Sequence, residues 1–358
     1  MTLEQDGDMK TGLILGTGKF ELREVDNPVV RKGGAVVAIS LCGICGSDIG
    51  AYKHGDDSPF AYPPAVCGHE WCGVIEDLDP EIDYLAVGDR VIFSAPPPCG
   101  TNCTACRQGK YSACSSIVAA FFGQDGFSPN SGGFAPRQCV DARRLIRMPD
   151  EISDIEGAMA EPASVASHCV RRSGLLTGDR VAVIGAGPIG LFTLQAAAAS
   201  GAQDILVIEP SATRRELARQ LGATHVCAPG REATECIGDI TRGLGVDQVF
   251  ECAGVAATLQ DATTYVRQRG TVNLLGLSGV KAAIDTDSWL VKEIAIQTSL
   301  GFDKADMEAA LVNMTNGSIN TKSMLTDTIP LENLESTIKE ISNGRDSVKI
   351  LVDPRDIS

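Results

Sequence analysis

Basic residues, histidines and long apolar runs are all scarce in this sequence. It contains 31 Lys and Arg against 46 Asp and Glu, which gives a formal net charge of −15. Because nucleic acids and anionic membrane surfaces are polyanions, this balance disfavours non-specific binding to either of them. No stretch is apolar over the length that a membrane span needs. We therefore expect neither a nucleic-acid partner nor a membrane partner.

The N-terminal segment MTLEQDGDMK is acidic and lacks the basic and apolar regions of a secretory signal, so we expect a cytoplasmic protein. The chain has 13 cysteines, an odd number, several of them closely spaced and mixed with His and Glu. In a reducing compartment this pattern is typical of metal ligands and buried thiols rather than of disulfides.

The length of 358 residues, with 44% hydrophobic residues, exceeds one ordinary core and predicts two domains. Short apolar runs separated by Gly, Pro and Asn over residues 10–93 indicate a compact, mostly-β domain. After Met148 and Pro149, helical stretches alternate with apolar strands, which indicates a doubly wound parallel sheet. The expected fold is α/β, with a Rossmann domain at 159–299 and a first domain at 1–158. A last strand at 348–352 is expected to return to that first domain, which residues 300–358 would complete.

Two short motifs bring a thiol, an imidazole and a carboxylate close together in the sequence. They are Cys42-Gly-Ile-Cys-Gly-Ser-Asp48 and Gly68-His-Glu70. A catalytic zinc takes about three protein ligands and keeps one position open, and Cys45, His69 and Glu70 could supply them, with Glu161 as a further carboxylate. Either motif alone fits a buried thiol and an unrelated histidine. Together, in a chain with only four histidines, they favour a metal site.

A second cysteine cluster consists of thiols at short spacing without histidine. Its members are Cys99, Cys103, Cys106 and Cys114. Four such thiolates predict a closed, tetrahedral structural zinc site. An iron–sulfur cluster is less common at this spacing. A nucleic-acid-binding zinc module would need a wider basic surface than this sequence offers.

The segment RVAVIGAGPIG at 180–190 places an apolar strand before a Gly-x-Gly-x-x-Gly turn, and an Ala-rich helix follows. This context predicts dinucleotide binding, with the pyrophosphate on the amides of the helix N-terminus; a glycine-rich turn in an unliganded domain is the alternative. Glu209 lies 19 residues after Gly190 and matches the carboxylate that binds the adenosine ribose. Its charge would repel a 2′-phosphate, which favours NAD over NADP. Arg214 and Arg215 could serve a phosphate, although arginines on a helix surface are commoner.

Two further segments end strands at the edge of the parallel sheet where a dinucleotide binds. They are Glu251-Cys-Ala-Gly254 and Leu275-Gly-Leu277, and their loops should line the nicotinamide pocket. The candidate cofactor-binding residues are Gly185, Gly187, Pro188, Ile189, Gly190, Glu209, Arg214, Cys252, Ala253, Leu275 and Leu277.

These motifs, in this order, resemble the zinc-dependent medium-chain alcohol dehydrogenase family, and in particular its polyol, sorbitol and 2,3-butanediol dehydrogenase branch. The resemblance covers the whole chain. It is carried by the two metal motifs, the four-cysteine lobe, Glu161-Pro-Ala-Ser-Val165, the glycine-rich segment, Glu209-Pro-Ser-Ala-Thr-Arg-Arg215 and Phe250-Glu-Cys-Ala-Gly254.

The resemblance implies a GroES-like first domain and a catalytic zinc held by Cys45 and His69, with Glu70 and Glu161 as carboxylates that ligate it in exchange with water. Zinc would polarise the oxygen of a secondary alcohol, diol or polyol. The Ser47 hydroxyl would accept the alcohol proton, and hydride would pass to NAD. Relatives are often dimers or tetramers joined through their cofactor domains, so we expect a homodimer or a homotetramer.

Three positions depart from the family pattern. Cys99 and Cys103 have three residues between them where two are usual, Gly50 stands where many relatives carry a relay histidine, and Trp71 replaces a smaller residue. Alternative functions are a threonine-type amino-alcohol dehydrogenase, an aldehyde or ketone reductase, and a catalytically silent NAD-binding protein.

Overall fold

The computed structural model describes residues 9–55, 65–94, 97–99, 103–108, 110–116, 132–277 and 281–355. The chain divides into two compact units, one formed by residues 1–161 and 325–358 and the other by residues 162–324. The sequence patterns placed the two boundaries at 158/159 and at 299/300. None of the described helices combines the length and the apolar character that crossing a bilayer requires.

The first unit is built on a seven-stranded sheet in the order β15-β16-β3-β5-β6-β8, with β7 also paired to β3. Strand β3 is buried along most of its length, which explains why its sequence GAVVAISLCG is almost continuously apolar instead of alternating. The strands of this sheet are β3 (Gly34–Gly43), β5 (Glu70–Leu78), β6 (Arg90–Phe93), β7 (Arg137–Asp141), β8 (Leu145–Arg147), β15 (Leu325–Pro330) and β16 (Lys349–Asp353).

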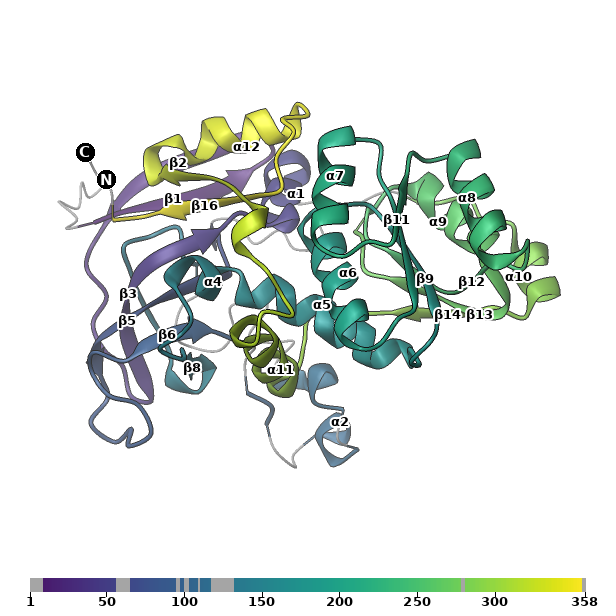
Figure 1. Ribbon diagram of the computed structural model, residues 1–358. Coiled ribbons are helices and arrows are strands. Elements are labelled where there is room, and N and C mark those ends of the chain that lie inside the picture. The colour runs from purple at the N-terminus through teal and green to yellow at the C-terminus, as the bar shows by residue number, and fades with distance from the viewer. Residues whose placement is uncertain are drawn as a thin grey trace. The chain divides into compact units, whose positions relative to one another are not determined.

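A smaller sheet of the same unit has the order β2-β1-β4. Its strands are β1 (Met9–Gly16), β2 (Lys19–Val25) and β4 (Ala65–Val66). Helix α12 (Leu334–Ser342) lies beside β1 and β2 (Figure 1). Its residues Leu334 and Ile338 share one buried core with Ile14 and with Tyr52 of α1 (Gly46–His54).

The C-terminal strand returns to the first unit, as the sequence predicted. Strand β16 pairs antiparallel with β3, with Val352 opposite Cys42 and Leu351 opposite Gly43. Because β3 leads directly into the first metal motif, this pairing brings residue 349 close to that motif.

The second unit contains a six-stranded parallel sheet in the order β11-β10-β9-β12-β13-β14. This is the strand order of a Rossmann fold, in which the ligand binds where the winding direction reverses, here between β9 and β12. Helices α6 and α7 lie on one side of the sheet, and α8 and α9 lie on the other (Figure 1). The elements are β9 (Arg180–Ile184), α6 (Pro188–Ala199), β10 (Asp204–Ile208), α7 (Ala212–Gln220), β11 (His225–Cys227), α8 (Arg231–Thr241), β12 (Val246–Glu251), α9 (Ala256–Tyr265), β13 (Val266–Leu274), α10 (Thr286–Lys292) and β14 (Ala295–Thr298).

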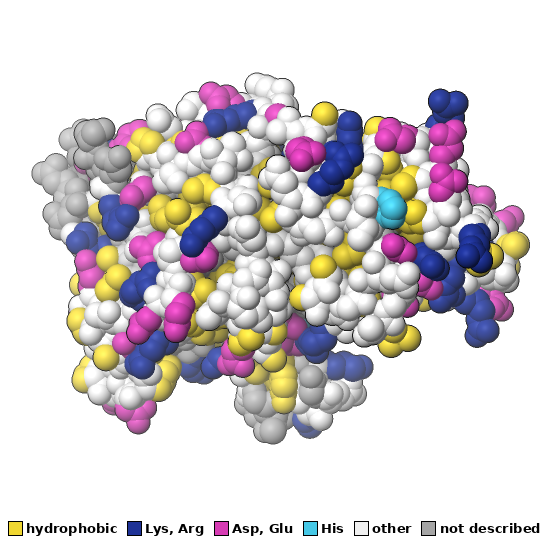
Figure 2. Space-filling model, in the orientation of Figure 1, with side chains coloured by type: hydrophobic (Ala, Val, Ile, Leu, Met, Phe, Trp, Pro, Cys, Tyr) yellow, Lys and Arg dark blue, Asp and Glu magenta, His cyan; other side chains and the backbone are white. Residues whose placement is uncertain are grey.

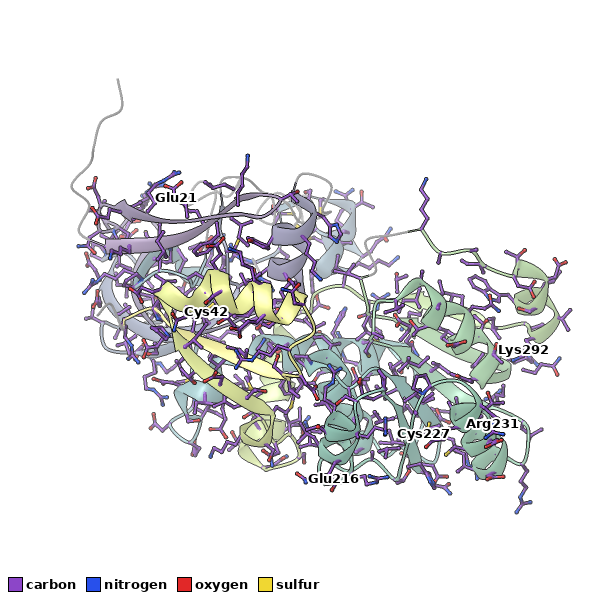
Figure 3. The ribbon with its side chains drawn as sticks, turned by 90° about the horizontal axis from the view of Figure 1, so that it is seen from above. Glu21, Cys42, Glu216, Cys227, Arg231 and Lys292 are labelled. Carbon is purple, nitrogen blue, oxygen red and sulfur yellow. The ribbon has the colours of Figure 1, made fainter. Side chains whose placement is uncertain are left out.

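Helix α10 is fixed to the end of α9 by one side chain. The Lys292 ammonium, labelled in Figure 3, donates to the backbone carbonyls of Thr263, Thr264 and Val266 at 2.9–3.0 Å. These carbonyls lie at the C-terminus of α9, where intrahelical partners run out and a cation is favoured.

The stretch 154–173 forms two helices. Helix α4 (Asp154–Ala158) is capped by Met159, and α5 (Ala160–Ser173) contains Pro162 in its first turn, where the missing amide costs no helical hydrogen bond. The remaining short helices are α2 (Thr104–Arg107), α11 (Lys304–Thr315) and the 3₁₀ segments Tyr111–Ala113, Ala142–Arg144, Lys322–Met324 and Leu331–Asn333.

Buried polar contacts join α5 to α11. His168 Nδ1 lies 2.7 Å from Asp306 Oδ2, and Arg171 Nε donates to Asp306 Oδ1 at 2.6 Å. His168 is thus a buried core residue. This attachment explains why residues 300–324, which the sequence patterns gave to the first domain, fall in the second unit.

Charged side chains are mixed on the molecular surface. On the face drawn in Figure 2, Lys and Arg are interspersed with Asp and Glu. The acidic excess of the sequence is therefore not gathered into one patch on this face.

Candidate active site

The first metal motif forms the junction between β3 and α1. Cys45 is the N-cap of α1, and its backbone amide donates to Asp48 Oδ2 at 2.9 Å in a capping box. Asp48 Oδ1 accepts from the amide of Gly68 at 3.3 Å. The buried Asp48 carboxylate therefore ties the two metal motifs together. Ser47 lies half-buried in the first turn of α1.

The second metal motif turns sharply before β5 begins at Glu70. Gly68 has φ +95°, and a Cβ there would lie 2.7 Å from Cys42 Sγ, so the position requires glycine. The turn directs the imidazole of His69 towards the thiol of Cys45.

One ligand atom from each of Cys45, His69 and Glu70 lies within 4.8 Å of the others. The structure thus brings together the three residues that the sequence proposed. Burial opposes a charged imidazole, but the Cys45 thiol and the Glu161 carboxylate outweigh it and raise the pKa of His69 well above its usual value. A site that favours a positive charge and offers S, N and O donors fits zinc.

Glu161 stands in the first turn of α5 and is half-buried. Burial raises its pKa to about 7, while His69 opposes this shift and Glu70 adds to it. Glu161 thus interacts electrostatically with the imidazole, but it does not belong to the group of three whose ligand atoms lie within 4.8 Å of one another.

Lys349 of β16 enters this site, and sequence reasoning missed it. It is 1% exposed, its ammonium forms an ion pair with Glu70 Oε2, and it donates to the carbonyl of Ile44 at 3.0 Å. Burial opposes the charge, but Glu70 and Cys45 outweigh it and raise the pKa of Lys349. Glu70 is therefore held by a permanent cation before any metal binds.

The four-cysteine lobe forms a compact sulfur cluster. Cys99 Sγ lies 3.6 Å from Cys106 Sγ, and Cys103 Sγ lies 3.8 Å from Cys114 Sγ. A tetrahedral ion with Zn–S bonds of about 2.3 Å places its sulfurs about 3.8 Å apart. The amide of Cys106 donates to Cys103 Sγ at 3.4 Å and lowers the pKa of that thiol. The geometry fits a structural zinc despite the extra residue between Cys99 and Cys103.

The glycine-rich turn lies at the carboxyl end of β9. Gly185 has φ +96°, Gly187 is the N-cap of α6 and Pro188 occupies its first turn. A Cβ on Gly190 would lie 1.9 Å from the carbonyl oxygen of Gly185, so the turn and the helix can approach only through glycine. Ile189 follows Pro188 in the first turn of α6, at one of the two free positions of the dinucleotide motif.

Glu209 follows β10, is buried, and has partners at both carboxylate oxygens. Oε2 accepts from the amide of Ala186 at 2.8 Å, and Oε1 accepts from the amide of Ser211 at 2.9 Å and pairs with Arg214 at 3.0 Å. Arg215 instead donates to the carbonyls of Glu209 and Pro210 at 2.7 Å. The carboxylate thus joins the glycine-rich turn to the start of α7.

The remaining cofactor candidates lie at the ends of β12 and β13. Cys252 and Ala253 follow β12, and the amide of Ala253 donates to Glu251 Oε1 at 3.0 Å. Leu275 and Leu277 follow β13, and the Leu277 side chain is largely exposed. They share the sheet edge at which the glycine-rich turn lies.

Two aromatic residues near the metal motifs are structural. Trp71 is fully buried and stacks on Phe93 with a centroid distance of 4.6 Å, which accounts for its size. Tyr52 is also buried. Its hydroxyl lies 3.3 Å from Gly18 O and from Glu335 Oε1.

Comparison with known proteins agrees with this geometry. Residues 188–316 match the model of the zinc-binding dehydrogenases, and residues 31–150 match that of the alcohol dehydrogenase GroES-like domain. The sorbitol dehydrogenase of Bacillus subtilis is 30% identical over 360 residues, which covers 99% of each chain. The chain belongs to the zinc-dependent medium-chain alcohol dehydrogenase family.

Solved structures resemble this dehydrogenase over nearly its whole length. The 2R,3R-butanediol dehydrogenase of Bacillus subtilis is 29% identical with a TM-score of 0.83, covering 97% of this chain and 100% of that one. A zinc-binding dehydrogenase of Sinorhizobium meliloti 1021, solved with NADP, is 30% identical with a TM-score of 0.84, covering 97% and 99%. The dehydrogenase thus belongs to the polyol and diol branch, whose chemistry uses zinc and a nicotinamide dinucleotide.

Proposed function

We propose that this dehydrogenase reversibly oxidises a secondary alcohol, diol or polyol to the corresponding ketone with NAD. The observation that carries the proposal is the convergence of Cys45, His69 and Glu70 on one point, in a chain that also has a complete dinucleotide-binding turn. A bound zinc would supply Lewis acidity that polarises the substrate oxygen.

Cys45 and His69 are the two ligands that the proposal treats as permanent. Because the Glu70 carboxylate already pairs with Lys349, it is proposed to share the role of carboxylate ligand with Glu161, in exchange with water. Asp48 orients both ligand segments through the amides of Cys45 and Gly68. Cys99, Cys103, Cys106 and Cys114 would hold the second, structural zinc.

Ser47 is the proposed proton acceptor. Its place two residues after Cys45, in the first turn of α1, keeps its hydroxyl in the neighbourhood of the metal site. A serine hydroxyl both donates and accepts, so it can take the alcohol proton and pass it to the cofactor ribose or to water. Gly50, where relatives carry a histidine, leaves this transfer to Ser47 and solvent.

The preference for NAD rests on Glu209. Its carboxylate would accept from a ribose hydroxyl but repel a 2′-phosphate. Arg214 is already paired with that carboxylate, which leaves it poorly placed to serve a phosphate instead. We expect kcat/KM to be at least about tenfold higher with NAD than with NADP.

The decisive experiment combines metal analysis with a panel of diols, polyols and amino alcohols. Cys45→Ala and His69→Ala should each lose one zinc per chain and reduce kcat by about 1000-fold or more, because several kcal/mol of Lewis-acid stabilisation disappear. Binding of NADH should persist. The matched controls are Cys236→Ala and His54→Ala, whose side chains lie outside both zinc sites.

Full activity in Cys45→Ala would refute the zinc role. Preferential turnover of threonine would instead support the amino-alcohol alternative. Binding of NADH without turnover of any alcohol or ketone in the panel would support a catalytically silent protein. Strong preference for NADP would overturn the role given to Glu209.

We further propose that the dehydrogenase is a homodimer or a pair of dimers joined through β14. This strand is last in the six-stranded order, and three of its four residues are exposed. Exposed strand edges readily pair with another chain.

A further inference from the structure

Glu251 is a buried carboxylate that the proposed chemistry leaves without a role. It is the last residue of β12, at the carboxyl edge of the parallel sheet. In this strand order a dinucleotide spans the switch point between β9 and β12. Since Glu209 marks the adenosine half beyond β10, the ends of β12 and β13 belong to the nicotinamide half.

One oxygen of the Glu251 carboxylate accepts three hydrogen bonds. Oε1 accepts from the amides of Ala253 and Gly254, both at 3.0 Å, and from the Thr258 hydroxyl at 2.7 Å. The backbone carbonyl of Glu251 accepts from the amides of Leu275 and Gly276, both at 2.9 Å. One residue therefore binds the loop after β12 with its side chain and the loop after β13 with its main chain.

The loops after β12 and β13 pack so closely that their contact positions admit only glycine. A Cβ on Gly276 would lie 2.2 Å from the amide nitrogen of Gly254 and 2.6 Å from Glu251 Oε2, and one on Gly254 would lie 2.7 Å from the carbonyl oxygen of Leu277. On the other side, a Cβ on Gly185 would lie 3.1 Å from Ala253. The loop that Glu251 organises is thus in contact with the glycine-rich turn.

Beside this contact between the two loops, two aliphatic side chains face solvent. Val255 is 55% exposed and Leu277 is 57% exposed. Val255 ends the loop 252–255, and Leu277 ends the loop 275–277, and Glu251 binds both loops. Exposed aliphatic side chains of this kind suit packing against a nicotinamide ring.

We propose that Glu251 is a positioning residue for the nicotinamide half of the cofactor. It holds the loops 252–255 and 275–277 in the arrangement that presents Val255 and Leu277 to the ring. The proposal rests on the proposed function, since it requires that a nicotinamide dinucleotide binds at this edge.

The test compares two ligands that differ in the nicotinamide. NADH carries the ring and ADP-ribose lacks it, so a residue that acts on the ring half should affect only the first. In Glu251→Ala we expect the Kd for NADH to rise by about tenfold or more, because charged hydrogen bonds to two loop amides are lost. The Kd for ADP-ribose, measured by calorimetry, should stay within about twofold of wild type. Glu251→Gln should recover part of the NADH affinity.

Thr258→Val removes one donor to the carboxylate and provides a milder variant if Glu251→Ala fails to fold. It should weaken NADH binding about threefold, again without affecting ADP-ribose. Glu232→Gln, an exposed glutamate in α8, is the matched control. Equal weakening of both ligands, or no weakening of NADH, would overturn the role of Glu251. Failure of the wild-type protein to bind ADP-ribose or NADH would instead count against the proposed function.

Discussion

Lys349 and Glu70 form an ion pair in which both side chains are almost wholly buried. Removing two charges from water is costly, and the pair is retained only where its geometry and additional hydrogen bonds offset that cost. Here the ammonium also reaches the carbonyl of Ile44. The arrangement keeps a carboxylate beside the metal site without committing it to the metal.

We predict that Lys349→Met releases Glu70 to bind the zinc permanently. X-ray absorption at the zinc edge should show one additional oxygen ligand, and kcat should fall by about tenfold to 100-fold, as for other changes next to metal ligands. If Glu70 stays unpaired instead, the variant should lose about 3 kcal/mol of stability. The double variant Lys349→Met, Glu70→Gln should recover stability. Unchanged coordination, activity and melting temperature in the single variant would contradict this role.

Asp306 supports a prediction about pH. Burial would raise its pKa, but hydrogen bonds from His168 and Arg171 outweigh burial and lower it to about 2. When the pKa of a carboxyl group is lower in the folded than in the unfolded state, its ionisation stabilises the fold at every pH above the pKa of the unfolded state. This stabilisation is lost as the pH falls through the pKa of the folded state. The shift from 3.8 to about 2 corresponds to about 2 kcal/mol.

We therefore expect Asp306→Asn to melt several degrees below wild type at pH 7. The difference should stay constant down to about pH 5 and shrink between about pH 4 and pH 2, where the wild type itself loses the contribution. Differential scanning calorimetry across this range measures it. The control Asp239→Asn, at an exposed site in α8, should show no such difference. A gap that persists unchanged at pH 2 would exclude the assigned ionisation.

The ligand residues could be proposed from the sequence because they occur in short motifs, whereas their partners could not. Lys349 lies 279 residues from Glu70 along the chain, and only the antiparallel pairing of β16 with β3 brings the two together. Asp48 did have a local signal. It stands three residues after Cys45, which is the spacing of a capping box.

Among the elements, those of the parallel sheet were the most predictable. Its strands are mostly apolar runs of three to nine residues between helices with clear start signals, such as Gly187 and Pro188 before α6. The placement of α11 was not predictable, because it depends on the long-range contact of Asp306 with His168. A hydrophobic pattern gives a helix its buried face but does not say which neighbour covers it.

The described part of the four-cysteine lobe contains short secondary structure. It includes α2 and the 3₁₀ segment Tyr111–Ala113, and Cys106 and Cys114 form a small core of their own. In segments of this kind the free energy of metal binding is the folding free energy.

We predict that Cys106→Ser lowers the zinc content from two to about one per chain and unfolds the lobe alone. Limited proteolysis should then cut within residues 99–116, while the Kd for NADH stays unchanged, because the dinucleotide turn belongs to the other unit. Cys236→Ser, at a half-buried thiol in α8, is the control. Retention of two zinc ions, or loss of NADH binding together with the zinc, would contradict the assignment.

At the scale of the whole molecule, the edge of the cofactor sheet at β14 is exposed. Strand β14 pairs with β13 on one side only among the described strands. Beside it, Leu290 is 77% exposed and Val291 is 76% exposed on α10, which Lys292 fixes in place. An unpaired strand edge flanked by exposed aliphatic side chains is a surface that a second copy of the chain can cover through backbone hydrogen bonds and apolar contact.

Because the backbone amides of β14 point alternately to its two sides, this association can be tested by removing a single amide donor. The amide of Ser299 donates inward to Leu274 at 3.0 Å, so the alternation of the strand turns the amide of Thr298 towards the open edge. Thr298→Pro removes that donor and keeps the hydrogen bonds between β14 and β13, whereas Thr298→Val keeps the donor and changes only the side chain.

We expect wild type and Thr298→Val to sediment as dimers or tetramers, and Thr298→Pro and Leu290→Asp to shift towards monomers at micromolar concentration. Because both variants leave the zinc and cofactor residues unaltered, NADH binding should persist in the monomer. An unchanged sedimentation coefficient in Thr298→Pro would place the contact between subunits elsewhere on the molecule.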